Sequence, residues 1–219
     1  MTSKNINNKG QDYELKEING FEDLELSDNL LKGIFAYGFE KPSDIQKKGI
    51  QAIKFKRDCI IQAQSGTGKT ATFLLGSLSL IDVEEKYCQS LVISPTRELA
   101  TQIYNVLKQL SKYTKISKAS CIGGTSMKKS MYDIKKGSQI VVGTPGRIFH
   151  MIDENYLDVS KLKIIVMDEA DDILSLGFTD KIYDILKLLP ENVQVCLLSA
   201  TMPRQVFDVT RNFMRDPIK

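Results

Sequence analysis

Six short apolar runs constrain the fold of this chain more than any other feature of its sequence. The runs are rich in Val, Ile and Leu, and the segments between them, such as "RELATQIYNVLKQLSKY", repeat apolar residues about every 3.6 positions. Strands of this composition that alternate with helices are typical of a parallel sheet covered on both faces. We therefore expect a single doubly wound α/β domain, with strands at 59–63, 90–94, 119–122, 139–143, 163–168 and 193–200.

The size and charge of the chain limit the classes of function that it can serve. Its 219 residues, of which 42% are hydrophobic, are enough to bury one sizeable core. The formal net charge is only +3, so any contact with nucleic acid has to come from a local basic patch and not from the overall field.

The cysteines and the apolar runs indicate the compartment. The four cysteines are far apart, form no CxxC pair and lie mostly inside apolar runs, which favours reduced, buried thiols. No apolar run approaches the roughly 20 residues that span a bilayer, and the N-terminus lacks the apolar segment of a signal peptide. We expect a soluble, intracellular protein without a membrane partner, with a flexible tail over residues 1–20 and a folded domain over 21–219.

The unusual segments of the sequence all follow predicted strands. In parallel α/β sheets, ligands bind where the loops gather at the carboxyl ends of the strands. The sequence therefore predicts one ligand site at that edge, built from the segments "AQSGTGKT", "PTREL", "GGT", "TPGR", "DEAD" and "SAT".

The segment "AQSGTGKT" (63–70) matches the phosphate-binding loop G-x-x-x-x-G-K-[ST], except that Ala63 replaces the first glycine. Gly66 and Gly68 let backbone N–H groups point at phosphate oxygens, Lys69 reaches the β- and γ-phosphates, and Thr70 is suited to bind Mg²⁺. A turn between strand and helix is the alternative, and the strand, loop and helix context favours the phosphate loop.

Four carboxylates crowd the sequence directly after the fifth predicted strand, at Asp168, Glu169, Asp171 and Asp172. Taken alone, they are explained by the preference of acids for the positive end of a helix dipole. A phosphate loop in the same chain changes this interpretation, because its nucleotide needs a metal ligand from another strand end. We expect Asp168 to bind Mg²⁺ and Glu169 to polarise the attacking water, whereas Asp172 is a helix-face acid.

The order of these motifs resembles that of the DEAD-box RNA helicases over about residues 21 to 219. The resemblance implies a RecA-like P-loop NTPase domain that uses ATP with Mg²⁺, in which "GFEKPSDIQ" (38–46) is the adenine-sensing Q motif. By the same resemblance Phe39 stacks on adenine and Gln46 hydrogen-bonds its edge. Taken alone, the two are equally ordinary helix-cap and core residues. The other nucleotide-binding positions that it implies are Ser65, Gly66, Thr67, Gly68, Lys69, Thr70, Asp171, Ser199 and Thr201, and the catalytic ones are Lys69, Asp168 and Glu169.

An RNA site is also implied by the resemblance. In the family the segments "PTRELA", "GG" and "TPGR" bind the sugar-phosphate backbone of single-stranded RNA without reading its sequence. Taken alone, "TPGR" is equally well a helix start, with Thr144 as N-cap and Pro145 in the first turn. The positions that correspond here are Thr96, Arg97, Gly124, Thr144 and Arg147.

Within the family, the segments "AYGFEKPSDIQ" and "FMRDPIK" are most similar to the translation initiation factor 4A subgroup, which includes an exon-junction relative. Leu176 and Asp44 depart from that subgroup's usual residues.

The resemblance also implies a second RecA-like domain beyond "FMRDPIK" that is absent from this chain. Initiation-factor scaffold proteins or exon-junction proteins are then the expected partners. A P-loop kinase or transport ATPase, and an RNA clamp with slow hydrolysis, are the alternative functions.

Overall fold

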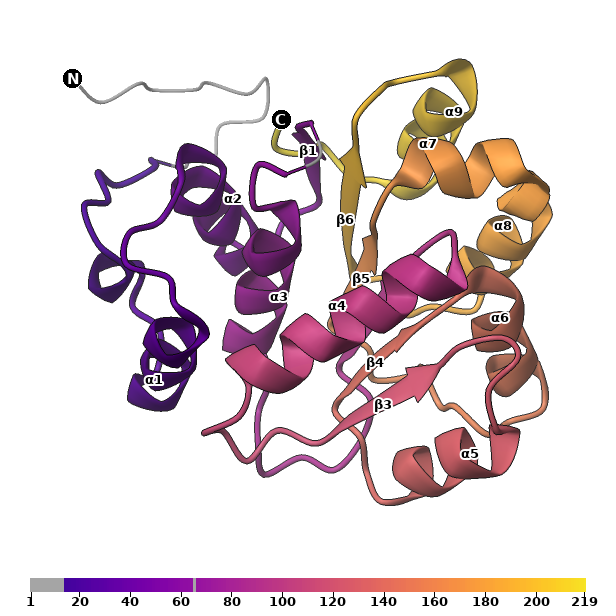
Figure 1. Ribbon diagram of the computed structural model, residues 1–219. Coiled ribbons are helices and arrows are strands. Elements are labelled where there is room, and N and C mark those ends of the chain that lie inside the picture. Colours follow the sequence, from indigo (N-terminus) through magenta and orange to yellow (C-terminus); the bar gives the residue numbers. More distant parts are fainter. Residues whose placement is uncertain (1–13, 65) are drawn as a thin grey trace.

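The computed structural model describes residues 14–64 and 66–219, and its centre is one six-stranded sheet in which every strand pairing is parallel (Figure 1). The strand order is β1-β6-β5-β2-β4-β3, so the chain crosses over between most neighbours. This confirms the predicted doubly wound sheet. The strands are β1 (Cys59–Gln62), β2 (Ser90–Ile93), β3 (Lys118–Cys121), β4 (Ile140–Gly143), β5 (Ile164–Met167) and β6 (Gln194–Ser199).

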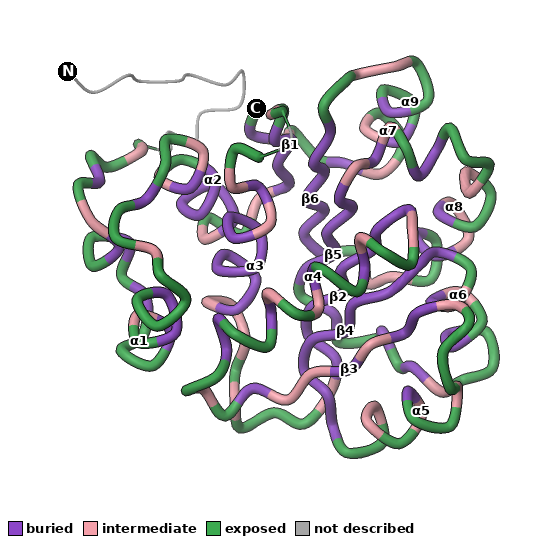
Figure 2. Tube along the Cα trace, viewed as in Figure 1, coloured by how far each residue is buried: buried purple, intermediate pink, exposed green. Residues whose placement is uncertain are grey.

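Helices cover both faces of the sheet because alternate residues of each strand point to opposite sides. In β5, Ile164 and Val166 enter one apolar cluster together with α1 to α4, whereas Ile165 and Met167 enter a second cluster with α6 to α9. Figure 2 shows β2, β4, β5 and β6 buried along their length between these layers. The helices are η1 (Phe21–Leu24), α1 (Asp28–Tyr37), α2 (Asp44–Lys54), α3 (Lys69–Ser79), α4 (Arg97–Leu110), α5 (Met127–Lys135), α6 (Pro145–Asp153), α7 (Ala170–Ile173), the π-helical turn η2 (Leu174–Phe178), α8 (Thr179–Lys187) and α9 (Arg204–Phe213).

The folded body includes residues that precede the boundary expected at Phe21. The side chain of Ile18 is 4% exposed and belongs to the cluster under α1 to α4. The backbone N–H of Lys16 donates to the side chain of Gln51 at 2.9 Å, and Gln51 donates back to the Lys16 carbonyl. Residues 1–13 of the expected tail lie outside the described residues.

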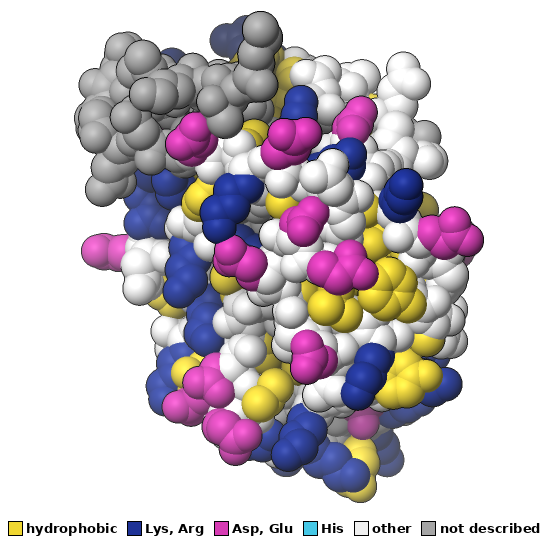
Figure 3. Space-filling view, turned by 90° about the vertical axis from the view of Figure 1, so that its left-hand side faces the viewer, with side chains coloured by type: hydrophobic (Ala, Val, Ile, Leu, Met, Phe, Trp, Pro, Cys, Tyr) yellow, Lys and Arg dark blue, Asp and Glu magenta, His cyan; other side chains and the backbone are white. Residues whose placement is uncertain are grey.

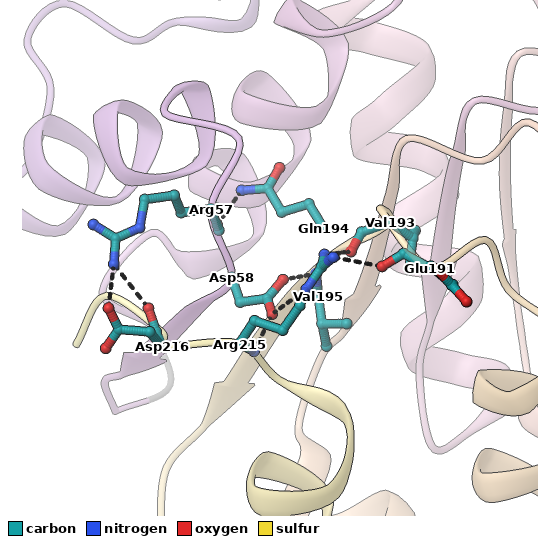
Figure 4. A network of polar contacts seen from close by, with 8 residues as sticks. All are labelled: Arg57, Asp58, Glu191, Val193, Gln194, Val195, Arg215 and Asp216. Carbon is teal, nitrogen blue, oxygen red and sulfur yellow. Dashed lines mark hydrogen bonds and ion pairs between the residues drawn. The ribbon is translucent and has the colours of Figure 1, made fainter. Parts of the chain in front are cut away.

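A polar network fastens the C-terminal segment to the amino ends of β1 and β6 (Figure 4). The buried carboxylate of Asp58 accepts hydrogen bonds from the N–H groups of Val195 and Arg215. Arg57 donates to the side chain of Asp216 at 2.9 Å, and Ile218 pairs with Cys59 as a parallel bridge. The network lies at the edge of the sheet opposite to the motif loops, so it supports the fold and leaves the site edge open.

All four cysteines are free and buried, as the sequence indicates. Burial raises the pKa of the Cys88 thiol well above its ordinary value, so it stays protonated. Within residues 14–64 and 66–219, no helix is both long and apolar enough to cross a membrane. On the side of the molecule where α1 and α2 lie, basic and acidic side chains are interspersed (Figure 3).

Candidate nucleotide and RNA site

The phosphate loop joins β1 to α3 as predicted, and its glycines hold the conformations that the loop needs. Gly66 and Gly68 have φ values of 82° and 97°, in the left-handed region that other residues avoid. Gly68 is also the N-cap of α3, so the first turn of that helix directs its free N–H groups into the loop. The Thr67 hydroxyl donates to the Gln64 carbonyl at 2.8 Å, a hydrogen bond within the loop. Ser65 lies outside the described residues.

Lys69 and Glu169 meet across 100 positions of sequence. The ammonium group of Lys69 donates to the Glu169 carboxylate at 2.9 Å, and the two side chains are only 5% and 17% exposed. Glu169 has φ 50° and ψ 57°, a left-handed conformation that costs of order 1–3 kcal/mol in a residue other than glycine. Lys69, which is expected to bind phosphates, therefore pairs with the Glu169 carboxylate. The phosphates of a nucleotide would compete with Glu169 for Lys69.

The Asp168 carboxylate is placed as a metal ligand would be. Its residue is 5% exposed, and its buried Oδ1 accepts no hydrogen bond. Burial and the neighbouring negative charge of Glu169 raise the pKa of Asp168 from 3.8 to about 6, although Lys69 opposes the shift. A buried carboxylate oxygen that accepts no hydrogen bond fits a cation.

The donor set suits Mg²⁺ in particular. The described residues contain no group of three or more His, Cys, Asp or Glu side chains that could hold a metal by themselves. Mg²⁺ is usually bound by one or two carboxylates together with substrate phosphates and water, so a single buried Asp168 beside a phosphate loop fits it. Thr70, in the first turn of α3, lines the same cavity as Asp168.

Asp171 links the acidic motif to the loop after β6. Its Oδ2 accepts hydrogen bonds from the N–H of Thr201 at 2.9 Å and from the Thr201 hydroxyl at 2.6 Å. Burial acts to raise the pKa of Asp171, but the hydrogen bonds, led by that of the Thr201 hydroxyl, outweigh it and lower the pKa. The Ser199 hydroxyl donates to the Thr201 carbonyl at 2.5 Å, so it holds this loop. Asp172 is exposed on α7.

The two residues expected to contact adenine differ in their surroundings. Phe39 is partly buried and lies in an aromatic group, with ring centroids 6.1 Å from Phe21 and 5.0 Å from Tyr37. Gln46 is 3% exposed, and its Oε1 accepts from the N–H of Ser43 at the start of α2. A Cβ on Gly68 would lie 2.9 Å from Gln46 Nε2, so this amide supports the loop directly.

Two hollows border the phosphate loop. The larger, about 1030 Å³, runs beside β1 and α2, and no residue of the acidic motif (168–171) lines it. The smaller, about 390 Å³, contains Lys69, Thr70, Asp168 and Glu169, and this volume is within the range of ligand sites. The charged groups converge on the smaller hollow, so its lining is the better suited of the two to phosphates.

The smaller hollow also contains residues that the sequence analysis did not single out. Tyr37 belongs to the same aromatic segment as Phe39, and this close spacing of two rings was a usable signal. The α4 side chains gave no signal, because their apolar spacing is that of any amphipathic helix. The additional lining residues are Tyr37, Ala71, Leu99, Gln102, Ile103 and Val106.

The residues expected to bind RNA come together at the ends of β2, β3 and β4. Gly123 and Gly124 lie in the turn after β3, which we call the glycine turn. The side chain of Arg97 lies over this turn, since a Cβ on Gly124 would be 2.5 Å from its guanidinium. Arg147 donates to the Thr125 carbonyl of the same turn at 3.4 Å. Thr96 caps α4, because its hydroxyl accepts from the N–H of Leu99.

Thr144 differs from a simple helix cap. It occupies the N-cap position of α6 with Pro145 in the first turn, as predicted, but its side chain makes no capping hydrogen bond. Its Oγ1 instead accepts from the N–H of Gly123 at 3.3 Å. The hydroxyl therefore ties the start of α6 to the glycine turn.

The sheet is parallel, a glycine-rich phosphate loop follows β1, and a buried aspartate follows β5, from which β1 is separated by β6 alone. These features define a P-loop nucleotide-binding domain of the RecA-like type. Residues 43–209 match the DEAD/DEAH box helicase family. The chain belongs to that family.

The relatives agree in sequence and in structure. The chain is 51% identical over 202 residues to eukaryotic initiation factor 4A of Caenorhabditis elegans, covering 92% of this chain and 50% of that protein. It is 51% identical over 199 residues to the ATP-dependent RNA helicase eIF4A of Aspergillus niger, covering 91% and 50%. The chain thus spans about half the length of the curated relatives that it matches.

Solved structures show the same fold. A DEAD box protein from the hyperthermophile Methanococcus jannaschii superposes with a TM-score of 0.87 at 34% identity, covering 92% of this chain and 55% of that one. S. cerevisiae Dbp5 bound to RNA and ADP BeF3 superposes with a TM-score of 0.83 at 33% identity, covering 91% and 51%. The predicted family and the RecA-like fold are therefore confirmed.

Proposed function

We propose that this chain is the nucleotide-binding half of an ATP-dependent RNA helicase that acts in translation initiation in the cytoplasm. The observation that carries the proposal is that Lys69, Asp168 and Glu169 converge on one cavity beside the phosphate loop. The basic residues around the glycine turn lie at the same edge of the same sheet. Initiation factor 4A relatives at about half identity favour initiation over an exon-junction role.

Each residue has a task that follows from its position. The N–H groups of the loop and of the first turn of α3 bind the β- and γ-phosphates, and Lys69 leaves Glu169 to join them. Asp168 and Thr70 would hold Mg²⁺, which neutralises phosphate charge. Once released from Lys69, Glu169 accepts a proton from the attacking water.

The remaining site residues select ATP and transmit its presence. The ring of Phe39 stacks on adenine. Gln46 packs against Gly68 of the phosphate loop, and its side-chain amide lies at the start of α2, where it binds the edge of the base. The bonds between Asp171 and Thr201 make the loop after β6 respond to movements of the acidic motif. The RNA backbone lies along Thr96, Arg97, Gly124, Thr144 and Arg147.

A second RecA-like domain, outside this chain, is the partner that completes the site in this proposal. The deciding experiment compares steady-state phosphate release by residues 1–219 and by the complete protein, each with and without single-stranded RNA. We expect stimulation by RNA only in the complete protein, because in the family the second domain supplies the arginine fingers, and such residues in comparable enzymes contribute roughly 10³- to 10⁵-fold in rate.

Two outcomes would overturn the proposal. Equal, RNA-stimulated rates in both proteins would show that the machinery is complete within this chain. ATP hydrolysis by the complete protein that is indifferent to RNA would return the chain to the class of P-loop ATPases that do not act on RNA.

A further inference from the structure

The exposed face of α5 carries more positive charge than its role in the fold requires. The inner face of the helix is satisfied by β3, since the Ser130 hydroxyl donates to the Ser120 carbonyl at 2.7 Å and three apolar side chains pack beneath it. The outer face presents Tyr132 and four exposed lysines that lie three or four positions from it, which makes them its neighbours. We call these five the α5 basic face: Lys128, Lys129, Tyr132, Lys135 and, at the C-cap, Lys136.

No ion pair neutralises the lysines of this face. The ion pairs found within the described part of the chain involve none of its four lysines. The one acid on α5, Asp133, is partly buried. Tyr132 is 58% exposed, and the ammonium group of Lys136 lies 4.3 Å from the centre of its ring. The lysines and the ring are therefore accessible to a ligand from solvent.

The α5 basic face continues the basic surface at the glycine turn. The turn over which Arg97 lies, and which Arg147 contacts, leads directly into α5, whose N-cap is Ser126. Thr125, which Arg147 contacts, precedes Lys128 by three residues, so their Cα atoms are at most about 11 Å apart. Arginines and lysines therefore form one track from the ends of β2 and β4 along α5.

We propose that the α5 basic face is an additional binding site for single-stranded RNA, which continues the track beyond Arg97 and Arg147. Lys128 and Lys129 contact successive phosphates, and the ring of Tyr132 stacks on a base. Lysines beside an exposed aromatic ring are the combination that binds single strands without regard to sequence. The inference rests on the proposed RNA-binding function and lengthens its footprint.

The charge pattern favours RNA over a protein partner. Where α1 and α2 lie, both signs are interspersed, as on an ordinary solvated surface (Figure 3). On α5 one sign is grouped around a stacking platform and adjoins residues already assigned to a phosphate backbone. An acidic polypeptide would use the lysines and would leave the ring of Tyr132 without a role.

The test uses the complete protein with a non-hydrolysable ATP analogue and oligouridylates of increasing length. The variant is Lys128→Gln, Lys129→Gln, Tyr132→Ala. The matched control is Lys112→Gln, Tyr113→Ala, Lys115→Gln, which removes the same residue types and the same charge before β3, at the opposite end of that strand. The control group also has a lysine over a tyrosine ring, at 5.5 Å.

We expect the α5 variant to bind the shortest RNAs as the wild type does, and to stop gaining affinity at a shorter length. On long RNA, the slope of log K against log salt should become about 1.4 units shallower, since each phosphate contact of a single strand contributes about 0.7. Tyr132→Ala alone should cost fivefold or more in affinity, and Tyr132→Phe should retain it because the ring remains. The control variant should match the wild type.

Several results would overturn the inference. Equal length dependence and salt slope in the α5 variant and the control would show that only overall charge matters. Loss of binding to polyglutamate with RNA binding intact would make the face a site for acidic proteins. If Arg97→Ala abolishes RNA binding while the α5 variant behaves like the control, the inference fails and the proposed function stands. If the wild type binds no RNA at all, the proposed function itself fails.

Discussion

Replacing Asp168 with Asn should stabilise the nucleotide-free domain while it abolishes metal-dependent binding. Burial and the charge of Glu169 raise the pKa of Asp168 from 3.8 to about 6, so keeping this carboxylate ionised at neutral pH works against folding. A shift of about two units at about 1.4 kcal/mol each corresponds to about 3 kcal/mol. Asparagine has the same shape and no charge, so we expect the free energy of unfolding to rise by about 1–3 kcal/mol at pH 7.5.

The sign of the pH dependence is specific. A folded-state pKa above the unfolded one means that the penalty is absent below about pH 3.8, grows as the pH rises and is complete above about pH 6. Urea unfolding of residues 1–219 at pH 4.5 and pH 7.5, without Mg²⁺, should show a stabilising effect of Asp168→Asn that is large only at pH 7.5. The exposed Asp172→Asn is the matched control. A destabilising or pH-independent effect of Asp168→Asn would refute the reasoning.

Four further changes test separate contacts. Lys69→Ala should abolish ATP binding measured by calorimetry, because it removes the cation of the phosphate loop, and unchanged affinity would exclude that assignment. Glu169→Gln in the complete protein should retain or strengthen ATP binding, because it weakens the 2.9 Å pair that holds Lys69, while RNA-stimulated turnover is lost. Normal turnover would leave Glu169 without a catalytic role. Phe39→Ala should weaken ATP more than inorganic triphosphate, and equal losses would make the ring structural. Gly33→Ala should lower stability by about 1–3 kcal/mol in thermal melts, because its Cβ would meet the Leu110 carbonyl, and an unchanged Tm would contradict that close approach.

The sequence by itself determined the parallel sheet, the order of its motifs and the phosphate loop. These properties are local: the apolar period of a strand and the glycines of a turn depend on residues a few positions apart. The conformation of the loop followed as well, because Gly66 and Gly68 take the left-handed angles that their residue type permits.

Only the tertiary structure decided which side chains meet. Lys69 pairs with Glu169 across 100 positions, and the Thr144 hydroxyl binds the Gly123 N–H across 21 positions in place of capping its own helix. Gln46 likewise lies against Gly68, whereas the sequence indicated a helix-cap or core residue and the family resemblance implied a contact to adenine. The residue types in a motif indicate which chemistry each side chain can perform. Which side chain it contacts is decided by how strands and helices from distant parts of the chain pack at one edge of the sheet. Packing around the buried acids also sets the pKa of Asp168, which no local pattern in the sequence specifies.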